Sequence, residues 1–256
     1  MEPSLEDVQF LANSANRVQV LTALVDEQAT RRELQDEVDG SRSTVARILD
    51  EAETRGWVDS EGTRYWLTPL GEGMVADFRS YLARVEGHQH LGELVNHLPP
   101  PLFALDSRHY SDAEIVELTP DNPAAPFSRA FELFQGATEY RGLNSTALPE
   151  HVKVLRDRIE ERSLEFEQVI EKSFVETLRD DQERSAVWAS LTDRVWVYDG
   201  VVPINVHVVD GTVLVWLGES RGEVAGLFVS DDPAVVTWAE SLYEEYRDDA
   251  EPLDEL

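Results

Sequence analysis

Residues 29–67 constrain the fold of this chain more than any other stretch. Thr30 is followed three residues later by Glu33, and this capping-box spacing predicts the start of a helix. Asp39-Gly40 then predicts a tight turn, since glycine adopts a positive φ at a helix end without a steric penalty. A short helix that ends in a glycine turn is therefore expected.

A second helix and a hairpin follow this turn. Ser41 or Ser43 can cap the helix, and Gly56 ends it. The apolar residues of the helix repeat at helical spacing and share one face: Val45, Ile48, Leu49 and Ala52. Residues 57–67 contain two short apolar segments around a polar tip, which is the pattern of a β-hairpin. Helix, turn, second helix and hairpin in this order predict a winged helix-turn-helix.

The second helix is the expected recognition element for double-stranded DNA. A helix of this width fits the major groove, and the preceding helix braces it across the backbone. Arginine can pair with guanine or grip a phosphate, and serine and threonine are short donors suited to either. The candidate DNA contacts are Thr30, Arg31, Arg32, Arg42, Ser43, Thr44, Arg47 and Arg64. The alternative is a winged helix that contacts only protein, with arginines that solvate its surface.

Four short motifs carry a resemblance to a known family. They are N-R-V-Q-V-L-T-A-L (16–24), S-R-S-T-V-A-R-I-L (41–49), R-G-W-V (55–58) and Y-W-L-T-P-L-G (65–71). With these motifs the chain resembles archaeal winged-helix transcriptional regulators, particularly those of salt-loving archaea. The resemblance covers about the first 90 residues and implies a sequence-specific repressor or activator.

The net charge of −29 argues at first against a nucleic-acid partner, because phosphates repel an acidic surface. Only Lys153 and Lys172 are lysines, and the other 20 basic residues are arginines. Acid excess with scarce lysine is typical of halophilic proteins, and at molar salt the Debye length is only about 3 Å. Residues 1–90 hold 9 basic and 17 acidic side chains, against 13 and 34 in the remainder. The position of the arginines is therefore better evidence for DNA binding than their number is.

Thr68-Pro69 predicts the start of a long amphipathic helix after the hairpin, with a capping side chain and proline at the first helical position. Such a helix is a common dimerisation element in regulators of this kind. A dimer would present two recognition helices to successive turns of a roughly palindromic operator. The alternative is that the helix packs only on its own subunit.

The chain is long enough for two modest domains. We expect a DNA-binding domain with its long helix over residues 1–87, and a linker over residues 88–102 because three consecutive prolines begin at Pro99. Residues 103–248 alternate strand and helix patterns, which predicts a mixed α+β domain, and residues 249–256 form an acidic tail. The fold class is therefore α+β, with a winged helix-turn-helix followed by a mixed α+β sensing domain.

Near the C-terminus, three apolar runs precede a helix, with Asp210-Gly211 as a strong hairpin turn between the first two runs. The segments V-H-V-V-D-G-T-V-L-V-W-L (206–217), V-A-G-L-F-V-S-D-D (224–232) and W-A-E-S-L-Y-E-E-Y (238–246) resemble the regulatory domain of archaeal methanogenesis and filamentation regulators. The resemblance implies a domain that senses an effector or binds a partner, without identifying the ligand.

Polar and aromatic residues at one predicted strand end and on two neighbouring strands suggest a small effector pocket. The candidates are Tyr140, Arg141, Asn144, Ser145, His207 and Trp216. An arginine there could meet a carboxylate or phosphate. The alternative for Arg141 is a structural ion pair, and for His207 and Trp216 it is ordinary sheet packing.

Other classes of function have little support in the sequence. Absence of cysteine excludes thiol redox sensing and thiolate metal sites. His88, His90 and His97 lie close together in sequence but lack a cluster of carboxylates at ligand spacing, so no metal and no cofactor is expected. No nucleotide-binding or hydrolase motif is present, so we expect that the protein is not an enzyme.

No signal peptide or apolar span is found either, so we expect a cytoplasmic protein. The interpretation is a dimeric DNA-binding regulator of a halophilic archaeon, modulated by a metabolite or protein at its C-terminal domain. The alternative is an adaptor that uses the winged helix to bind another regulator. The operator, the effector and the sign of regulation are not encoded in any motif.

Overall fold

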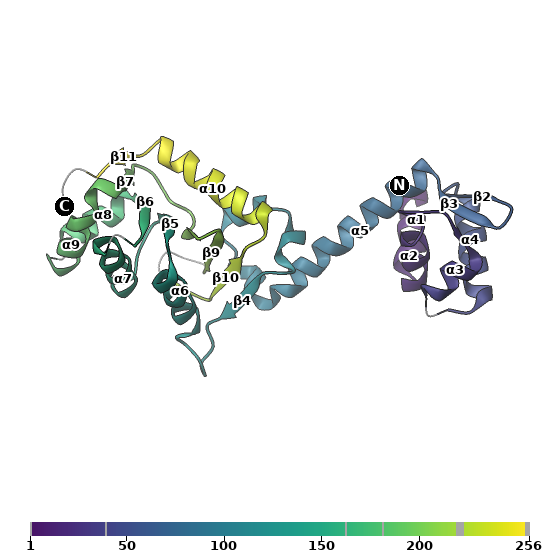
Figure 1. Ribbon diagram of the computed structural model, residues 1–256, viewed down its shortest axis with the longest axis horizontal. Helices are drawn as coiled ribbons and strands as arrows, with labels where there is room; N and C mark the ends of the chain where they lie inside the picture. Colours follow the sequence, from purple (N-terminus) through teal and green to yellow (C-terminus); the bar gives the residue numbers. More distant parts are fainter. Residues whose placement is uncertain (1, 39, 162, 181, 219–222, 254–256) are drawn as a thin grey trace. The chain divides into compact units, whose positions relative to one another are not determined.

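The computed structural model describes residues 2–38, 40–161, 163–180, 182–218 and 223–253. The chain divides into two compact units, Met1–Ala83 and Arg84–Leu256, each with its own hydrophobic core (Figure 1). The two units are described separately below.

The first unit is a winged helix-turn-helix. Its elements in chain order are α1 (Glu2–Ala12), α2 (Ala15–Thr22), β1 (Ala29–Thr30), α3 (Arg31–Asp36), α4 (Arg42–Thr54), β2 (Val58–Glu61), β3 (Arg64–Leu67) and the start of α5 (Pro69–His90). The wing sheet has the order β1-β3-β2, and β1 adds a strand that the sequence pattern did not predict. The apolar face of α4 is buried as expected, so this helix is anchored in the core of the first unit.

The helix ends follow the predicted capping chemistry, with one exception. Thr30 and Glu33 form a complete capping box at α3, and Ser41 rather than Ser43 caps α4. Gly56 ends α4 with a φ of 71°. Gly40 does not adopt the positive φ that we expected, and a Cβ there would approach the Asn16 amide nitrogen to 3.3 Å. The glycine therefore serves close packing, while Asp39 lies outside the described residues.

The second unit is built on a mixed sheet of order β11-β7-β6-β5-β8-β9-β10-β4. The strands are β4 (Glu114–Glu117), β5 (Glu139–Asn144), β6 (Glu165–Glu171), β7 (Val195–Tyr198), β8 (Val206–Val209), β9 (Thr212–Leu217), β10 (Gly226–Ser230) and β11 (Glu251–Pro252). Strands β5, β6 and β7 run parallel to one another, and the other pairs are antiparallel. Asp210 and Gly211 form the predicted β8–β9 turn, with φ values of 48° and 77°.

Helices cover both faces of this sheet (Figure 1). One face packs against α6 (Ala125–Gly136), α7 (Pro149–Glu160), α8 (Lys172–Arg179) and α9 (Gln182–Trp188). The other packs against α10 (Pro233–Asp248) and the 3₁₀ helices η1 (Gly92–His97), η2 (Pro100–Ala104) and η3 (Ser107–Tyr110), while η4 (Ala189–Arg194) leads into β7. The second unit is thus a three-layer α+β structure.

Two of the expected domain boundaries are corrected by the packing. Residues 88–102 were expected to be a linker, but Leu91, Leu94, Leu98 and Leu102 are buried in the core of the second unit. Pro100 and Pro101 begin η2, so the proline run starts a helix that stays packed in the core. In the tail expected over residues 249–256, β11 pairs with β7 and Leu253 is buried.

Candidate functional site

The N-terminus of α4 presents its short polar side chains to solvent in a local hydrogen-bond network. The Ser41 hydroxyl oxygen accepts from the Thr44 backbone N–H at 3.2 Å. The same oxygen lies 2.7 Å from the Ser43 hydroxyl and 3.0 Å from that of Thr44. This network fixes the first turn of α4 and holds the hydroxyls of the predicted DNA contacts Ser43 and Thr44 at the helix end.

Both arginines of α4 that we predicted to contact DNA are exposed. Arg42 Nε donates to Gln35 Oε1 of α3 at 3.2 Å. The Arg47 side chain is 60% exposed and pairs with Glu51 one turn along the same helix, at 3.3 Å. An exposed pair of this kind is worth only a few tenths of a kcal/mol. A nearby phosphate can therefore compete for the guanidinium at little cost.

The remaining predicted contacts lie on α3 and on the wing. Arg31 pairs with Asp50 of α4 at 3.3 Å and lies over the Tyr65 ring, 5.3 Å from its centroid. Arg64 donates to the Gln28 carbonyl at 3.3 Å, and Arg32 is exposed. The Thr30 hydroxyl is occupied by the capping box of α3. These contacts bring the bracing helix, α4 and the wing together, with arginines on each.

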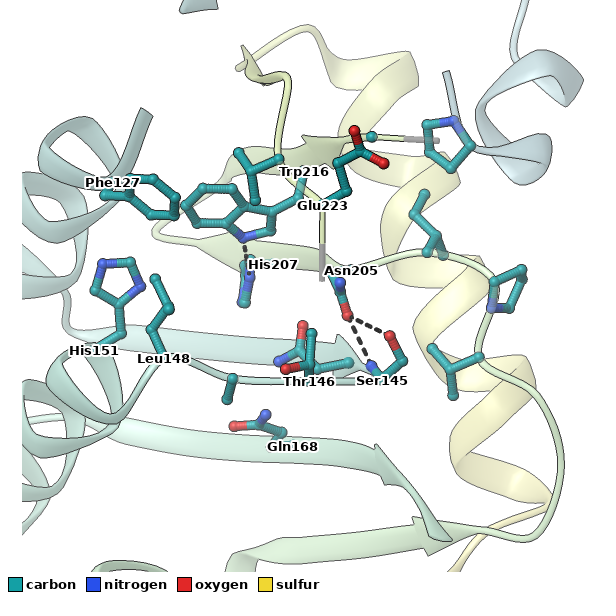
Figure 2. A pocket seen from close by; sticks show the side chains of 18 of the residues that line it. Phe127, Ser145, Thr146, Leu148, His151, Gln168, Asn205, His207, Trp216 and Glu223 are labelled. Atoms are coloured by element: carbon teal, nitrogen blue, oxygen red, sulfur yellow. Dashed lines mark hydrogen bonds between the residues drawn. The ribbon is translucent and has the colours of Figure 1, made fainter. Parts of the chain in front are cut away.

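A second candidate site is a pocket of about 780 Å³ in the second unit. It lies at the carboxyl end of β5, between the sheet and the first turns of α6 and α7 (Figure 2). Five of the six predicted effector residues line it: Tyr140, Asn144, Ser145, His207 and Trp216. Their side chains come from β5, β8 and β9, which are neighbours in the sheet.

Arg141 does not join this pocket, and its placement there was wrong. Successive side chains of a strand point to opposite faces, so Arg141 faces away from the layer that Tyr140 faces. Its guanidinium lies 3.5 Å from Glu240 of α10. The alternative of a structural ion pair is therefore the one that the structure supports.

A chain of hydrogen bonds through His207 runs along one side of the pocket. Trp216 Nε1, which can only donate, lies 2.9 Å from His207 Nε2 (Figure 2). The Tyr140 hydroxyl lies 2.7 Å from His207 Nδ1. The proton of neutral His207 must therefore sit on Nδ1. Burial lowers the pKa of His207 to about 3, with a further contribution from His151, so the imidazole is uncharged at neutral pH.

Side-chain amides form the floor of the pocket. Asn205 Oδ1 accepts from the backbone N–H and the hydroxyl of Ser145, at 2.7 and 3.2 Å (Figure 2). Asn144 is 1% exposed and its Oδ1 has no hydrogen-bond partner, which is rare for a buried polar atom. Gln168 of β6 is 2% exposed and also lines the pocket.

Aromatic rings form the wall opposite these amides. Phe127 and Trp216 have ring centroids 5.4 Å apart, and His151 is stacked on Trp216 at 6.0 Å (Figure 2). Burial lowers the pKa of His151 as well, which favours its neutral form. The pocket therefore combines flat apolar faces with uncharged hydrogen-bonding groups.

The lining residues missed in the sequence include Phe127, His151, Gln168 and Asn205. A signal existed for Gln168, because it lies two residues after Phe166 in a strand pattern and therefore on the same, apolar face. His151, Phe127 and Asn205 reach the pocket only through helix and strand packing, which no local pattern encodes. The histidines of the 88–97 region do not contribute to it, and His90 Nε2 instead lies 2.7 Å from the Ala113 carbonyl.

The fold and these sites define a class: a winged helix-turn-helix joined to a mixed α+β domain with a pocket, as in transcription-regulator-like proteins. Residues 5–90 match the family model described as HVO_A0261 N-terminal domain. Residues 123–249 match the model described as methanogenesis regulatory protein FilR1, middle domain. The chain resembles the archaeal winged helix-turn-helix transcriptional regulators that carry a C-terminal regulatory domain of this kind.

No curated protein matches the chain. Its similarity to solved structures is weaker than its match to the two family models. An archaeal chromatin protein, TrmBL2, is 14% identical, with 96% of this chain and 98% of that chain covered and a TM-score of 0.42. The phospholipase D family member Nuc from Salmonella typhimurium is 13% identical over 55% of this chain and 97% of its own, also with a TM-score of 0.42. At these scores neither structure indicates a function. No helix in the described part of the chain is both long and apolar enough to cross a membrane.

Proposed function

We propose that this protein is a sequence-specific regulator of transcription in a halophilic archaeon, which acts in the cytoplasm as a dimer on double-stranded DNA. The observation that carries the proposal is the exposed first half of α4. Its capped N-terminus presents Ser43 beside the exposed guanidinium groups of Arg42 and Arg47. Exposed arginines at the start of the second helix of a helix-turn-helix are suited to base edges and phosphates.

Helix α4 would lie in the major groove of the DNA. Arg64 of the wing and Arg31 and Arg32 of α3 would contact the phosphate backbone. The carboxylate partners of these arginines, Asp50 and Glu51, are themselves partly exposed. Phosphates can thus replace them without leaving a buried charge. Concentrated salt would screen the repulsion between phosphates and the rest of the acidic surface.

A dimer would form through α5. Leu70 and Tyr81 are large apolar side chains of α5 and are 57% and 58% exposed. They are eleven residues apart, about three helical turns, so they share one side of α5. A second copy that covers this side would also fix the separation of two recognition helices. Ligand or partner binding at the second unit would then change operator affinity by favouring one arrangement of the dimer.

Occupancy of chromosomal DNA in cells grown at high salt tests this proposal. Wild-type protein should be recovered at discrete sites, and Arg42→Ala together with Arg47→Ala should abolish most of that occupancy. Arg79→Ala, which removes an exposed arginine of α5, is the matched control and should leave occupancy unchanged. Undiminished occupancy in the double variant would favour the adaptor alternative, in which another protein holds the DNA.

A further inference from the structure

We infer that the pocket at the carboxyl end of β5 binds an uncharged planar heterocycle with adjacent hydrogen-bond donor and acceptor atoms, the chemistry of a nucleobase. The inference deepens the proposed function, because it names the chemical class of the effector. Only the effect of effector binding on DNA affinity rests on the proposed function. Three features of the pocket carry it: the low charge of its described lining, buried amides with unpaired atoms, and a flat aromatic wall.

The described lining of the pocket carries little charge, which disfavours strongly ionic ligands. Its described lining residues include neither lysine nor arginine, and Glu223 is their single carboxylate. His207 cannot supply a cation, because Trp216 donates to its Nε2 and burial disfavours its protonation. A charged ligand that left water for this pocket would lack the opposite charge that could offset its lost hydration.

The buried amides favour a ligand that both donates and accepts. Asn144 Oδ1 has no partner although the residue is almost fully buried, while the side-chain amide of Asn144 also interacts with the Tyr140 hydroxyl. Among the described residues, no hydrogen bond is made by the side-chain amide of Gln168, which is 2% exposed. Each amide offers two donors and one acceptor, and leaving such groups unpaired inside a protein is costly. A ligand edge with neighbouring N–H and C=O groups satisfies both kinds of atom.

The sheet places these two amides on one face. Gln168 of β6 is in register with Gly142 of β5, and Gly142 is in register with His207 of β8. Asn144 follows Gly142 by two residues and therefore faces the same side. Gly142 has no side chain, and the Tyr140 side chain occupies the space above it, where a Cβ would lie 2.6 Å from the Tyr140 hydroxyl. Both amides therefore lie on the pocket side of the sheet, on the same face as Tyr140.

The wall of the pocket is suited to a flat ring. Phe127, Trp216 and His151 lie together with interplanar angles of 32° and 28° between neighbouring rings (Figure 2). Stacking of a base on an aromatic side chain is worth about 1–3 kcal/mol in nucleic-acid complexes. A volume of about 780 Å³ leaves space for a nucleoside as well as for a free base.

Calorimetric titration of the full chain at high salt, with DNA absent, tests the inference. The probes are uracil and adenine as free bases, uridine and adenosine as nucleosides, AMP as a charged analogue, and glucose as an uncharged ligand without an aromatic ring. We expect at least one base or nucleoside to bind, and AMP and glucose to bind at least tenfold more weakly. Comparing the affinity for free bases with that for nucleosides shows which of these two kinds of ligand the pocket prefers.

Binding should depend on the floor amides. Gln168→Met and Asn144→Leu keep the side-chain size but remove the hydrogen bonds, and each should weaken the bound probe by about tenfold. Gln89→Met changes an exposed glutamine of α5 and should have no effect. Circular dichroism shows whether each variant is folded, and Gln168→Met alone suffices if Asn144→Leu unfolds.

Three results would overturn the inference: no base or nucleoside binds, AMP or glucose binds as tightly as they do, or folded Gln168→Met retains full affinity. None of these results bears on the proposed DNA binding, which is measured by occupancy with variants of α4. Loss of occupancy in those variants together with failure of every base would keep the regulator and reject this class of effector.

Discussion

Among single residues, His207 shows how burial determines chemistry. A histidine is normally close to half-protonated near pH 6.5, but here its Nε2 accepts from Trp216 and its surroundings are apolar. The folded protein therefore holds it neutral, with a pKa of about 3. In acid, this histidine is protonated in the unfolded chain but stays neutral in the native state, so low pH favours unfolding.

His207→Gln should remove this contribution. Since the pKa of His207 is about 3 in the folded protein, wild type loses stability relative to the variant as pH falls below about 6.5, and the loss continues toward pH 3. The expected difference grows by about 1.4 kcal/mol per pH unit. Denaturant unfolding of both proteins at several pH values measures it. A constant difference between pH 6 and pH 4 would show that His207 titrates normally.

Gly142→Ala should destabilise the second unit. A Cβ at this position would lie 2.6 Å from the Tyr140 hydroxyl, and the Tyr140 ring cannot retreat because it is stacked on Phe166 at 5.0 Å. Overpacking of this kind costs about 1–3 kcal/mol. Gly136→Ala is the control, since a Cβ there meets nothing within 4 Å. Equal unfolding free energies for Gly142→Ala and wild type would contradict the tight packing of Tyr140.

At the scale of elements, the features that the sequence predicted correctly are those that depend on residues close together in the chain. The capping box of α3, the serine cap of α4 and the Asp210-Gly211 turn all follow from residues a few positions apart. The 3₁₀ helices after α5 were not predicted, because prolines indicate where a helix stops and not whether the chain beyond it is buried. Their leucines become core residues only once α10 and the sheet are in place.

The pocket was predictable in part for the same reason. Tyr140, Asn144 and Ser145 are neighbours in sequence, so a strand end was enough to group them. Alternation along β5 should have excluded Arg141 from that group. Gln168 joins Asn144 through the parallel β5–β6 pairing, which needs the intervening α7 crossover. Pairing between distant strands is not encoded in any single segment.

Ser41→Ala should weaken the start of α4. The Ser41 hydroxyl accepts from the Thr44 N–H, and loss of an N-cap costs about 1 kcal/mol. Amide hydrogen exchange in the first turn of α4 should therefore become about fivefold faster. Ser43→Ala removes a neighbouring hydroxyl that makes no capping bond to the backbone, and exchange there should remain within twofold of wild type. Equal protection in all three proteins would mean that the cap contributes nothing.

At the scale of the whole molecule, the net charge of −29 governs stability. Self-repulsion among carboxylates opposes the compact state, and salt screens it. The unfolding midpoint should rise steeply as KCl increases from about 0.1 M to about 3 M. Thermal unfolding followed by circular dichroism measures the effect. A midpoint that does not change with salt would contradict the halophilic interpretation of the composition.

The proposed association through α5 also concerns the whole molecule. Leu70→Glu with Tyr81→Glu places carboxylates on the exposed apolar side of the helix and should convert a dimer into a monomer, because burying unpaired charges is unfavourable. Ala76→Glu adds a charge to another side of α5 and should leave the dimer intact. Sedimentation equilibrium at high salt gives the masses. A wild-type mass of one chain would reject the dimer.

The central claim is that the surface of α4 recognises duplex DNA by sequence. Selection of binding sites from a random duplex pool, with the full chain at about 2 M KCl, tests it most directly. The account predicts that wild type enriches one motif and that Arg42→Ala with Arg47→Ala loses this enrichment while remaining folded. Failure of wild type to enrich any motif, or the same motif from the double variant, would contradict it.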